Sequence, residues 1–352
     1  MLNTYIVGQM EAKRALAVAA YYHYTDLDRA LAANGSGPRT FKKKHNVLLI
    51  GPSGCGKTYL AETLASQLGV PFVNEDASTL TDTGYVGRSV SDVLIHLLAQ
   101  CQFDTNKALR GMIYLDEIDK ITKPSHASWR DISGGEVQNE LLRLLSGEDF
   151  TLSAKEKQFV MPTNTLFVVC SGAFQGIAEI IRQRTSQGGI GFNAKLQKEE
   201  GTERENLLHE VTPEDLEKYG FILEFIRRFH TTVALNHLSE NDLLRILTEP
   251  KDASIKYYQR IAHMEKSDLH FTDGALRAIA RLAKERGTGA SGLDEILNKK
   301  LQRTLRALPS WEGRFPYIEV TEDVILDDAG VSRPIRYEKR PANGALVPSD
   351  DQ

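Results

Sequence analysis

The sequence of 352 residues contains few cysteines and no long apolar run. Its three cysteines, Cys55, Cys101 and Cys170, lie far apart and form no CxxC pair, which argues against a zinc site and against a disulfide framework. No apolar run approaches the length of a membrane span, and the N-terminus lacks the charged and apolar pattern of a signal peptide. We therefore expect a cytoplasmic protein that does not contact a membrane.

The sequence also lacks an excess of positive charge. Lysine and arginine together number 43 against 47 aspartates and glutamates, so the formal net charge is −4. A protein whose affinity depends on releasing counterions from nucleic acid needs a basic surface, so this balance argues against nucleic acid as a partner. One small basic cluster, Lys42, Lys43 and Lys44, is typical of a solvated loop.

The chain is long for a single hydrophobic core, and its apolar fraction of 41% can fill two. Residues 238–306 repeat apolar side chains at helical spacing, and a strand-like segment follows them at 317–320, which predicts a smaller, mostly helical domain. Residues 332–352 are polar and show no apolar periodicity, as in a disordered tail. We expect a larger domain over 1–235, the helical domain over 236–330 and a tail over 331–352.

The most informative stretch is an apolar run at 47–50 that leads into GPSGCGKT at 51–58. Glycines let several backbone N–H groups converge on one phosphate, and a helical pattern at 59–68 would direct its N-terminus at the same point. Lys57 would reach the β and γ phosphates, and the Thr58 hydroxyl would hold Mg²⁺. The predicted ATP-binding residues here are Gly51, Pro52, Ser53, Gly54, Cys55, Gly56, Lys57, Thr58 and Tyr59.

Two further strands end in polar residues. The apolar stretch from Gly111 ends at Asp116 and Glu117, the first of which would bind the Mg²⁺ shell while the second polarises the attacking water. A surface turn after a buried strand could also carry two acids. The strand at 166–169 leads to Ser171, which would touch the γ-phosphate or the lytic water, or would cap the helix starting near Gln175.

Two motifs have no part in nucleotide chemistry. GYVG at 84–87 places Tyr85 and Val86 between glycines, where they would be exposed, or where Tyr85 would fold back onto the core. The polar insertion 185–212 contains Ile190, Gly191 and Phe192, and a loop of this length in a compact domain is usually functional or disordered. Its two apolar side chains would tuck into the parent domain or dock into a partner.

In this order the phosphate loop, GYVG, LDEIDK at 115–120, GAF at 172–174, IGF at 190–192 and EFIRR at 224–228 resemble the ClpX family of AAA+ unfoldases. The resemblance runs from about Tyr5 to about Asp327. The similar HslU ATPases fit less well, because IGF is a ClpX feature and the large HslU insertion is not visible. The resemblance implies an α/β fold, a P-loop NTPase of the AAA+ type, whose parallel sheet has helices on both faces and is followed by a smaller, mostly helical C-terminal domain.

The resemblance also implies roles for individual residues. It makes Ser171 sensor 1 and Arg228 an arginine finger that reaches the neighbouring subunit, so that the assembly is a homo-hexameric ring. The other implied roles are adenine packing by Ile6 and Val7, chemistry by Lys57, Thr58, Asp116 and Glu117, a substrate pore lined by Tyr85 and Val86, and docking on a ClpP-type peptidase by Ile190, Gly191 and Phe192.

Three departures from the family pattern stand out. The N-terminal four-cysteine zinc domain is absent, by natural loss or by truncation. The connection between Gly147 and Leu166 is short and has no match to the basic RKH loop, for which Lys155 and Lys157 are poor substitutes. The GAR motif, whose arginine is sensor 2, is Gly289-Ala290-Ser291 here.

The favoured function is an ATP-driven ring that unfolds tagged or unfolded proteins and threads them into a peptidase. The alternative is a slowly hydrolysing, nucleotide-gated remodelling or scaffold ring.

Overall fold

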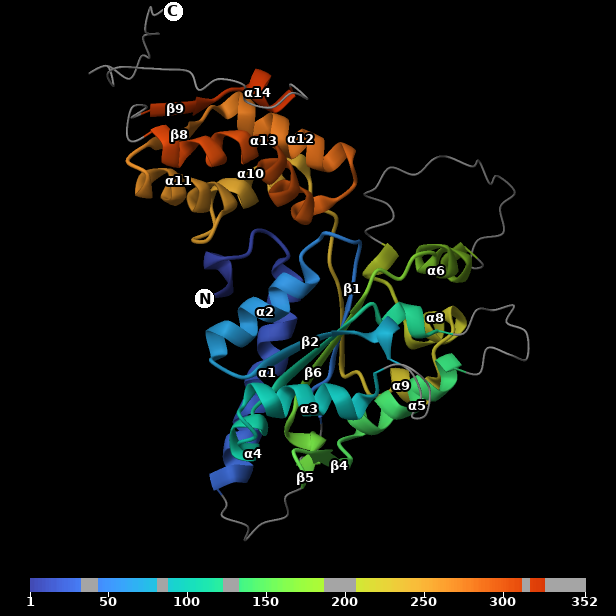
Figure 1. Ribbon diagram of the computed structural model, residues 1–352. Helices are drawn as coiled ribbons and strands as arrows, with labels where there is room; N and C mark the ends of the chain where they lie inside the picture. The colour runs from blue at the N-terminus through green and yellow to red at the C-terminus, as the bar shows by residue number, and fades with distance from the viewer. Residues whose placement is uncertain (33–43, 81–87, 123–132, 187–206, 312–316, 327–352) are drawn as a thin grey trace, which may run out of the picture. The chain divides into compact units, whose positions relative to one another are not determined.

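The computed structural model describes residues 1–32, 44–80, 88–122, 133–186, 207–311 and 317–326. They form two compact units, which we call the sheet unit and the helical unit (Figure 1). The sheet unit consists of Gln9–Pro52 and Gly56–His237, and the helical unit consists of Met1–Gly8, Ser53–Cys55 and the chain from Leu238 onward. Within the described ranges, no helix combines the length and the apolar character that crossing a membrane requires.

A five-stranded parallel sheet in the order β2-β3-β6-β1-β7 forms the centre of the sheet unit (Figure 1). Strands β1 and β6 are buried along their whole length, as expected where helices cover both faces of a parallel sheet. The predicted parallel sheet is confirmed. The strands are β1 Val47–Ile50, β2 Phe72–Asp76, β3 Met112–Asp116, β6 Phe167–Gly172 and β7 Thr231–Ala234.

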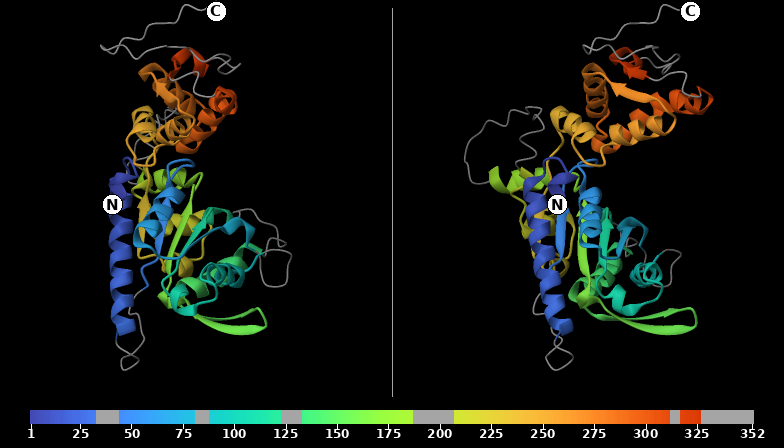
Figure 2. Two further views of the ribbon diagram at one scale, coloured as in Figure 1. Left: turned by 60° about the vertical axis from the view of Figure 1, so that its left-hand side comes forward. Right: turned by 90° about the vertical axis from the view of Figure 1, so that its left-hand side faces the viewer.

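Helices cover both faces of this sheet, as predicted. Helix α1 contacts β1 and β7, and α2 contacts β2, β3 and β6. Helices α3 and α5 share a hydrophobic core with Leu48, Ile113 and Val168 on the other face, and Figure 2 shows α1 and α3 on opposite sides of the strands. The α-helices of this unit are α1 Met10–Ala32, α2 Lys57–Leu68, α3 Val90–Gln100, α4 Thr105–Ala108, α5 Ser133–Ser146, α6 Ile177–Ser186, α8 Pro213–Tyr219 and α9 Leu223–Ile226, and its 3-10 helices are η2 Ala77–Thr79, η3 Ile118–Ile121 and η4 Thr163–Thr165.

An antiparallel hairpin of β4 Asp149–Ala154 and β5 Lys157–Pro162 occupies the segment that the sequence predicts only as a short connection. It extends from the body of the sheet unit (Figure 2). Its two turn residues, Lys155 and Glu156, both have positive φ, at 50° and 61°. Such two-residue turns usually contain Asn or Gly, so the sequence carries no recognisable hairpin signal. Lys155 Nζ lies 4.1 Å from the centre of the Phe103 ring, a cation–π contact.

The described residues of the helical unit from Leu238 onward, 238–311 and 317–326, are mostly helical, as predicted, and have their own hydrophobic core. Ser239 and Thr272 accept hydrogen bonds from backbone N–H groups in the first turns of α10 and α12, so both helices begin at a capping side chain. The expected strand at 317–320 pairs in parallel with an unpredicted strand, β8. The elements are η1 Leu2–Thr4, α10 Glu240–Thr248, α11 Ser254–Met264, β8 Asp268–Phe271, α12 Asp273–Glu285, α13 Gly289–Trp311, β9 Tyr317–Val320 and α14 Glu322–Leu326.

Candidate nucleotide site

The phosphate loop joins the carboxyl end of β1 to the first residue of α2, Lys57. The N-cap of α2 is Gly56, with φ 94°, and no side chain caps the helix. A helix start without a side-chain cap leaves its first N–H groups available to an anion, and the helix dipole favours negative charge there. Lys57 Nζ donates to the carbonyl oxygens of Gly51 at 2.7 Å and Pro52 at 2.9 Å. The loop therefore places a cation beside a helix N-terminus that has no side-chain cap.

A chain of hydroxyl and carboxylate groups connects α2 to two strand ends. Thr58 Oγ1 donates to Asp116 Oδ2 at 2.8 Å, and Ser171 Oγ donates to Asp116 Oδ1 at 2.5 Å. The Tyr114 hydroxyl lies 3.2 Å from Thr58 Oγ1 and 2.6 Å from Ser171 Oγ, so it bridges the two. The structure thus brings together the three site residues that the sequence predicts on α2, β3 and β6.

This oxygen set suits Mg²⁺. A hydroxyl and a carboxylate at 2.8 Å from each other are hard oxygen ligands, and Mg²⁺ in nucleotide sites usually takes one or two carboxylates together with phosphate oxygens and water. Among the described residues, no group of three or more His, Cys, Asp or Glu could hold a metal ion by itself. Thr58 and Asp116 would therefore bind Mg²⁺ only together with the phosphate oxygens of a nucleotide.

Glu117 lies one residue beyond Asp116 and takes a left-handed backbone conformation, with φ 53°. Its N–H donates to Asp116 Oδ1 at 2.9 Å, and its side chain is exposed. Left-handed φ is uncommon for residues other than glycine and tends to occur at functional sites. The turn therefore ends the strand and leaves the Glu117 carboxylate accessible beside Asp116.

Two comparisons identify relatives. An AAA domain of the Cdc48 subfamily matches residues 42–232. The ATP-binding subunit ClpX of the ATP-dependent Clp protease from Treponema denticola is 39% identical over 322 residues, which cover 89% of this chain and 77% of that protein. The subunit ClpX 3 from Methylococcus capsulatus is 40% identical over 326 residues, 88% of this chain and 75% of that protein. The chain belongs to the ClpX family of AAA ATPases. The resemblance found in the sequence motifs is confirmed.

Sequence reasoning missed two polar residues of this ClpX-family site. One is Tyr114, which lies in the middle of an apolar strand and carries no motif signal. The other is Asp119, which is 5% exposed and accepts hydrogen bonds from the N–H groups of Ala173 at 3.3 Å and Phe174 at 3.2 Å. A Cβ at Gly172 would lie 2.5 Å from Asp119 Oδ1, so the glycine lets β3 and β6 approach at their ends. The acidic stretch thus contacts the end of β6 twice. Asp116 bonds to Ser171, and Asp119 bonds to the backbone just beyond Gly172.

Ser171 was predicted either to contact phosphate or water or to cap the helix after β6. Its Oγ bonds to Asp116 and Tyr114, and α6 begins only at Ile177. Because the side chain is fully buried, its interaction with a bound nucleotide would pass through Asp116. Ser171 therefore does not cap α6, and its contact with phosphate or water stays a prediction.

Arg228 lies at the other end of the sheet. It follows α9 and precedes β7, which pairs in parallel with β1 so that Thr231 is opposite Val47. The phosphate loop leaves the far end of β1, about 13 Å along a strand of four residues at about 3.3 Å each. The Arg228 side chain is exposed and forms no ion pair or hydrogen bond with any residue the structure describes. Arg228 and Lys57 therefore lie at opposite ends of one strand pair.

The remaining predicted residues fall into three groups. Tyr59 is exposed at the start of α2 in the sheet unit. In the helical unit, Val7 is buried and Ile6 is half-buried, and the backbone of Gly54 accepts a hydrogen bond from Ala290 N–H at 2.9 Å. Ser53 and Cys55 flank Gly54 in the same unit. Tyr85, Val86, Ile190, Gly191 and Phe192 lie outside the described residues.

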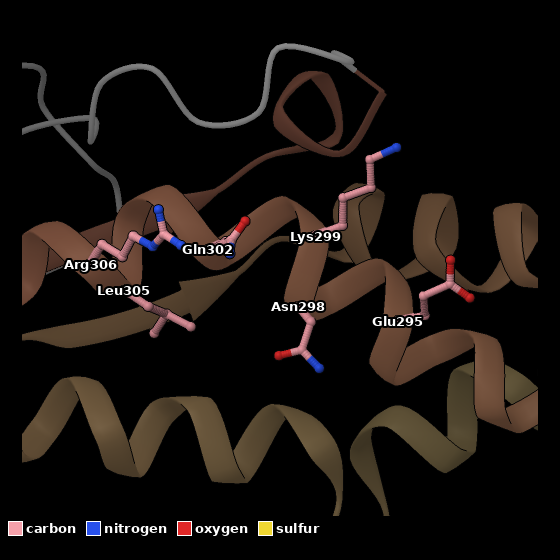
Figure 3. A pocket seen from close by; sticks show the side chains of 6 residues that line it. All are labelled: Glu295, Asn298, Lys299, Gln302, Leu305 and Arg306. Carbon is pink, nitrogen blue, oxygen red and sulfur yellow. The ribbon is translucent and has the colours of Figure 1, made fainter.

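The position of the missing sensor 2 arginine lies at the start of α13. Ser291 Oγ donates to Thr288 O at 2.8 Å, a local contact within the helix start. Arg286 pairs with Glu295 at 3.7 Å, and Lys300 is only 4% exposed. Lys299 is among the residues that line a hollow of about 670 Å³ along α13, and its side chain points away from that of Asn298 (Figure 3). The residues that line this hollow are Glu295, Asn298, Lys299, Gln302, Leu305 and Arg306.

Proposed function

We propose that this chain is an ATP-dependent protein unfoldase that assembles as a homo-hexameric ring and feeds unfolded or tagged proteins to a ClpP-type peptidase. The observation that carries the proposal is the contact of Thr58 with Asp116 beside Lys57 at the start of α2. We assign the ATP-binding domain to 1–235, the small domain to 236–330 and a tail to 331–352, and we place the protein in the cytoplasm.

The residues of the sheet unit divide the work of hydrolysis. The first N–H groups of α2 and Lys57 would bind the β and γ phosphates, and Thr58 and Asp116 would hold Mg²⁺, which neutralises charge on the phosphates when bound. Glu117 would orient the attacking water and accept its proton. The Thr58–Asp116 contact and the accessible position of Glu117 support these roles.

The position of Arg228 supports a ring. An unpaired, exposed guanidinium at the far end of the strand pair from the phosphate loop cannot serve the site of its own subunit, but it can serve a neighbour's. Each subunit would therefore provide a phosphate loop to one site and an arginine finger to the next.

The remaining assignments follow from family membership. Ile6 and Val7 would pack on the adenine, and the buried position of Val7 is consistent with an apolar contact. Tyr85 and Val86 would line the pore and grip the substrate chain. Ile190, Gly191 and Phe192 would dock on the peptidase.

The test measures ATP hydrolysis, unfolding of a tagged fluorescent substrate and its degradation, with and without a ClpP-type peptidase. We expect unfolded protein to stimulate hydrolysis, and degradation to require the peptidase. Tyr85→Ala should impair unfolding and retain peptidase docking, whereas deletion of 190–192 should retain hydrolysis and unfolding and abolish degradation. No unfolding by the parent protein under these conditions would contradict the proposal.

One observation favours a second candidate, a slowly hydrolysing remodelling or scaffold ring. Ser291 replaces the sensor 2 arginine and bonds locally to Thr288, and Arg286 is engaged with Glu295. A lost charge-assisted contact costs about 1.5 to 3 kcal/mol, or a slowing of roughly tens to hundreds of fold. Ser291→Arg should then raise the hydrolysis rate, and Arg286→Ala should lower it if Arg286 has taken the role. Brisk hydrolysis by the parent that Ser291→Arg does not change would contradict this candidate.

A further inference from the structure

The chain around Arg228 is fixed by a buried asparagine that no motif identifies. Asn46 precedes β1 and is 1% exposed. Its Nδ2 donates to Arg228 O at 3.0 Å and to Leu145 O, in the last turn of α5, at 2.9 Å. Its backbone carbonyl also accepts from His230 N–H at 3.2 Å. Asn46 thus contacts the backbone on both sides of Phe229 and joins it to α5.

Aromatic packing fixes the other side of the same segment. Phe225, in α9, stacks on Phe221 with ring centres 5.5 Å apart and meets Phe229 edge to face at 5.3 Å. Helices α5 and α9 are in contact, and they lie together in Figure 1. Arg228 therefore extends from a backbone held by Asn46 and by neighbouring aromatic rings, while its own side chain is exposed.

Of the two polar atoms in the Asn46 side chain, only Nδ2 forms hydrogen bonds with described residues. Both hydrogen bonds of Nδ2 are made, whereas Oδ1 is buried and has no hydrogen-bond partner among the described residues. A buried acceptor without a partner is unfavourable, and a leucine of similar volume would avoid it. The two hydrogen bonds that Nδ2 donates, one of them to Arg228 O, therefore explain why a polar residue occupies this buried position.

We propose that Asn46 is a positioning residue for the Arg228 finger. The inference rests on the proposed function, because it needs Arg228 to act on the nucleotide of a neighbouring subunit. The finger works only if the guanidinium reaches the developing charge, and a displacement of about 1 Å at a catalytic group can cost about a hundredfold in rate. By bonding to Arg228 O, Asn46 fixes the point from which the side chain extends.

The test uses mixed rings, which separate the two roles of a subunit. Lys57→Ala subunits lack their own nucleotide site and provide the finger, whereas Arg228→Ala subunits lack the finger and provide the nucleotide site. Neither variant alone should hydrolyse ATP, and mixing them should restore hydrolysis. Asn46→Leu is then placed in one subunit type at a time. We expect at least about a tenfold loss in kcat when it is in the Lys57→Ala subunit, and a change within about twofold when it is in the Arg228→Ala subunit.

Thr163→Val is the matched control. Thr163 is fully buried and its Oγ1 donates to Leu144 O at 3.2 Å, in the same last turn of α5, but it does not contact Arg228. We expect this variant to change the restored rate by less than about twofold in either subunit, because it removes an α5 contact and leaves the finger in place. Asn46→Ser, which keeps one donor, should give an intermediate loss and serves as the readout if Asn46→Leu does not fold.

The outcomes separate the two proposals. If mixing does not restore hydrolysis, Arg228 is not a finger, and this inference falls with that assignment. If mixing restores hydrolysis but the Asn46 variants reduce it equally in both subunits, or only in the subunit that holds nucleotide, Asn46 acts on folding or on the phosphate loop. In that case the positioning role is wrong while the proposed function stands.

Discussion

The two ends of the parallel sheet use similar side chains in different ways. At the carboxyl ends, Thr58, Asp116 and Ser171 bond mainly to one another. At the amino ends, buried side chains bond to backbone carbonyls, as Lys44 Nζ does to Leu144 O and His23 Nε2 does to Thr165 O. Lys57 is an exception at the carboxyl ends, because its Nζ bonds to two carbonyl oxygens of its own loop. Side chains that pair with each other or bond within their own loop can exchange partners when a ligand arrives, whereas buried bonds to the backbone of a distant element hold the chain in place.

Burial makes the titration of the amino-end groups abnormal. Lys44 is buried, so the prediction that it lies in a solvated loop is wrong. Burial lowers the pKa of Lys44 to about 7, although the nearby Cys170 acts in the opposite direction. Burial also lowers the pKa of His23 to about 3, with further lowering from Lys44 and His45 and a partial offset from the bond to Thr165 and from Asp26. These groups are therefore expected to affect stability, and the carboxyl-end groups to affect hydrolysis.

The largest effect is expected from Glu117→Gln at the carboxyl end. The variant keeps the phosphate loop and should bind ATP and assemble, but kcat should fall by about 10² to 10⁴, or roughly 3 to 5 kcal/mol. Steady-state hydrolysis and binding of a fluorescent nucleotide measure the two steps. Lys57→Ala is the contrasting variant and should lose nucleotide binding itself. Parental turnover by Glu117→Gln would remove Glu117 from the catalytic role.

At the amino end, His23→Gln should make stability less sensitive to acid. The unfolded chain protonates this histidine near pH 6.5 and the folded chain only near pH 3, so the unfolded state binds more protons between these values and the free energy of unfolding falls as the pH falls. At pH 4, His23 should lower the free energy of unfolding by about 3 kcal/mol relative to its value at pH 7. Urea unfolding of parent and variant at pH 7 and pH 4 measures the difference. Replacement of the exposed His263 by glutamine is the control, and an equal acid sensitivity of parent and His23→Gln would contradict the assignment.

The smallest effects are expected from two tyrosines, one at each end of the sheet. Tyr114→Phe removes the hydroxyl that bridges Thr58 and Ser171, and should lower kcat about five- to tenfold, the equivalent of about 1 kcal/mol, with little change in KM. Tyr24→Phe removes a 3.3 Å bond to Arg110 O, just before β3, and should lower stability by about 1 kcal/mol with hydrolysis unchanged. Loss of activity in both variants, or in neither, would mean that the two ends do not differ in this way.

The sequence predicted the parts of the fold that depend on local pattern. The apolar runs before Gly51 and Asp116 identified β1 and β3, and the glycines and Lys57 identified the loop between β1 and α2. The missed elements include strand β7 and the β4–β5 hairpin. Strand β7 has β-branched residues but only one strongly apolar side chain, Val233, and so lacks the apolar run that identified β1. The β4–β5 turn is made by Lys155 and Glu156 in place of Asn and Gly.

Partners within the site were harder to predict than its members. Tyr114 looks like any aromatic residue of a buried strand, and only the register of β3 with β6 turns its hydroxyl toward Ser171. Asn46 gives no signal either, because its acceptors at Leu145 and Arg228 are 99 and 182 residues away in the chain. Contacts of this kind depend on the assembled fold and not on local periodicity.

The placement of Arg228 and the phosphate loop at opposite ends of β1 and β7 bears on enzyme kinetics. If Arg228 acts on a neighbouring subunit as we propose, each chain carries two incomplete halves of a catalytic centre, and an isolated chain contains no complete one. By mass action, the specific activity should then depend on total protein concentration and fall on dilution, even at saturating ATP. The apparent reaction order in protein would exceed one below the dissociation constant of the assembly and approach one above it.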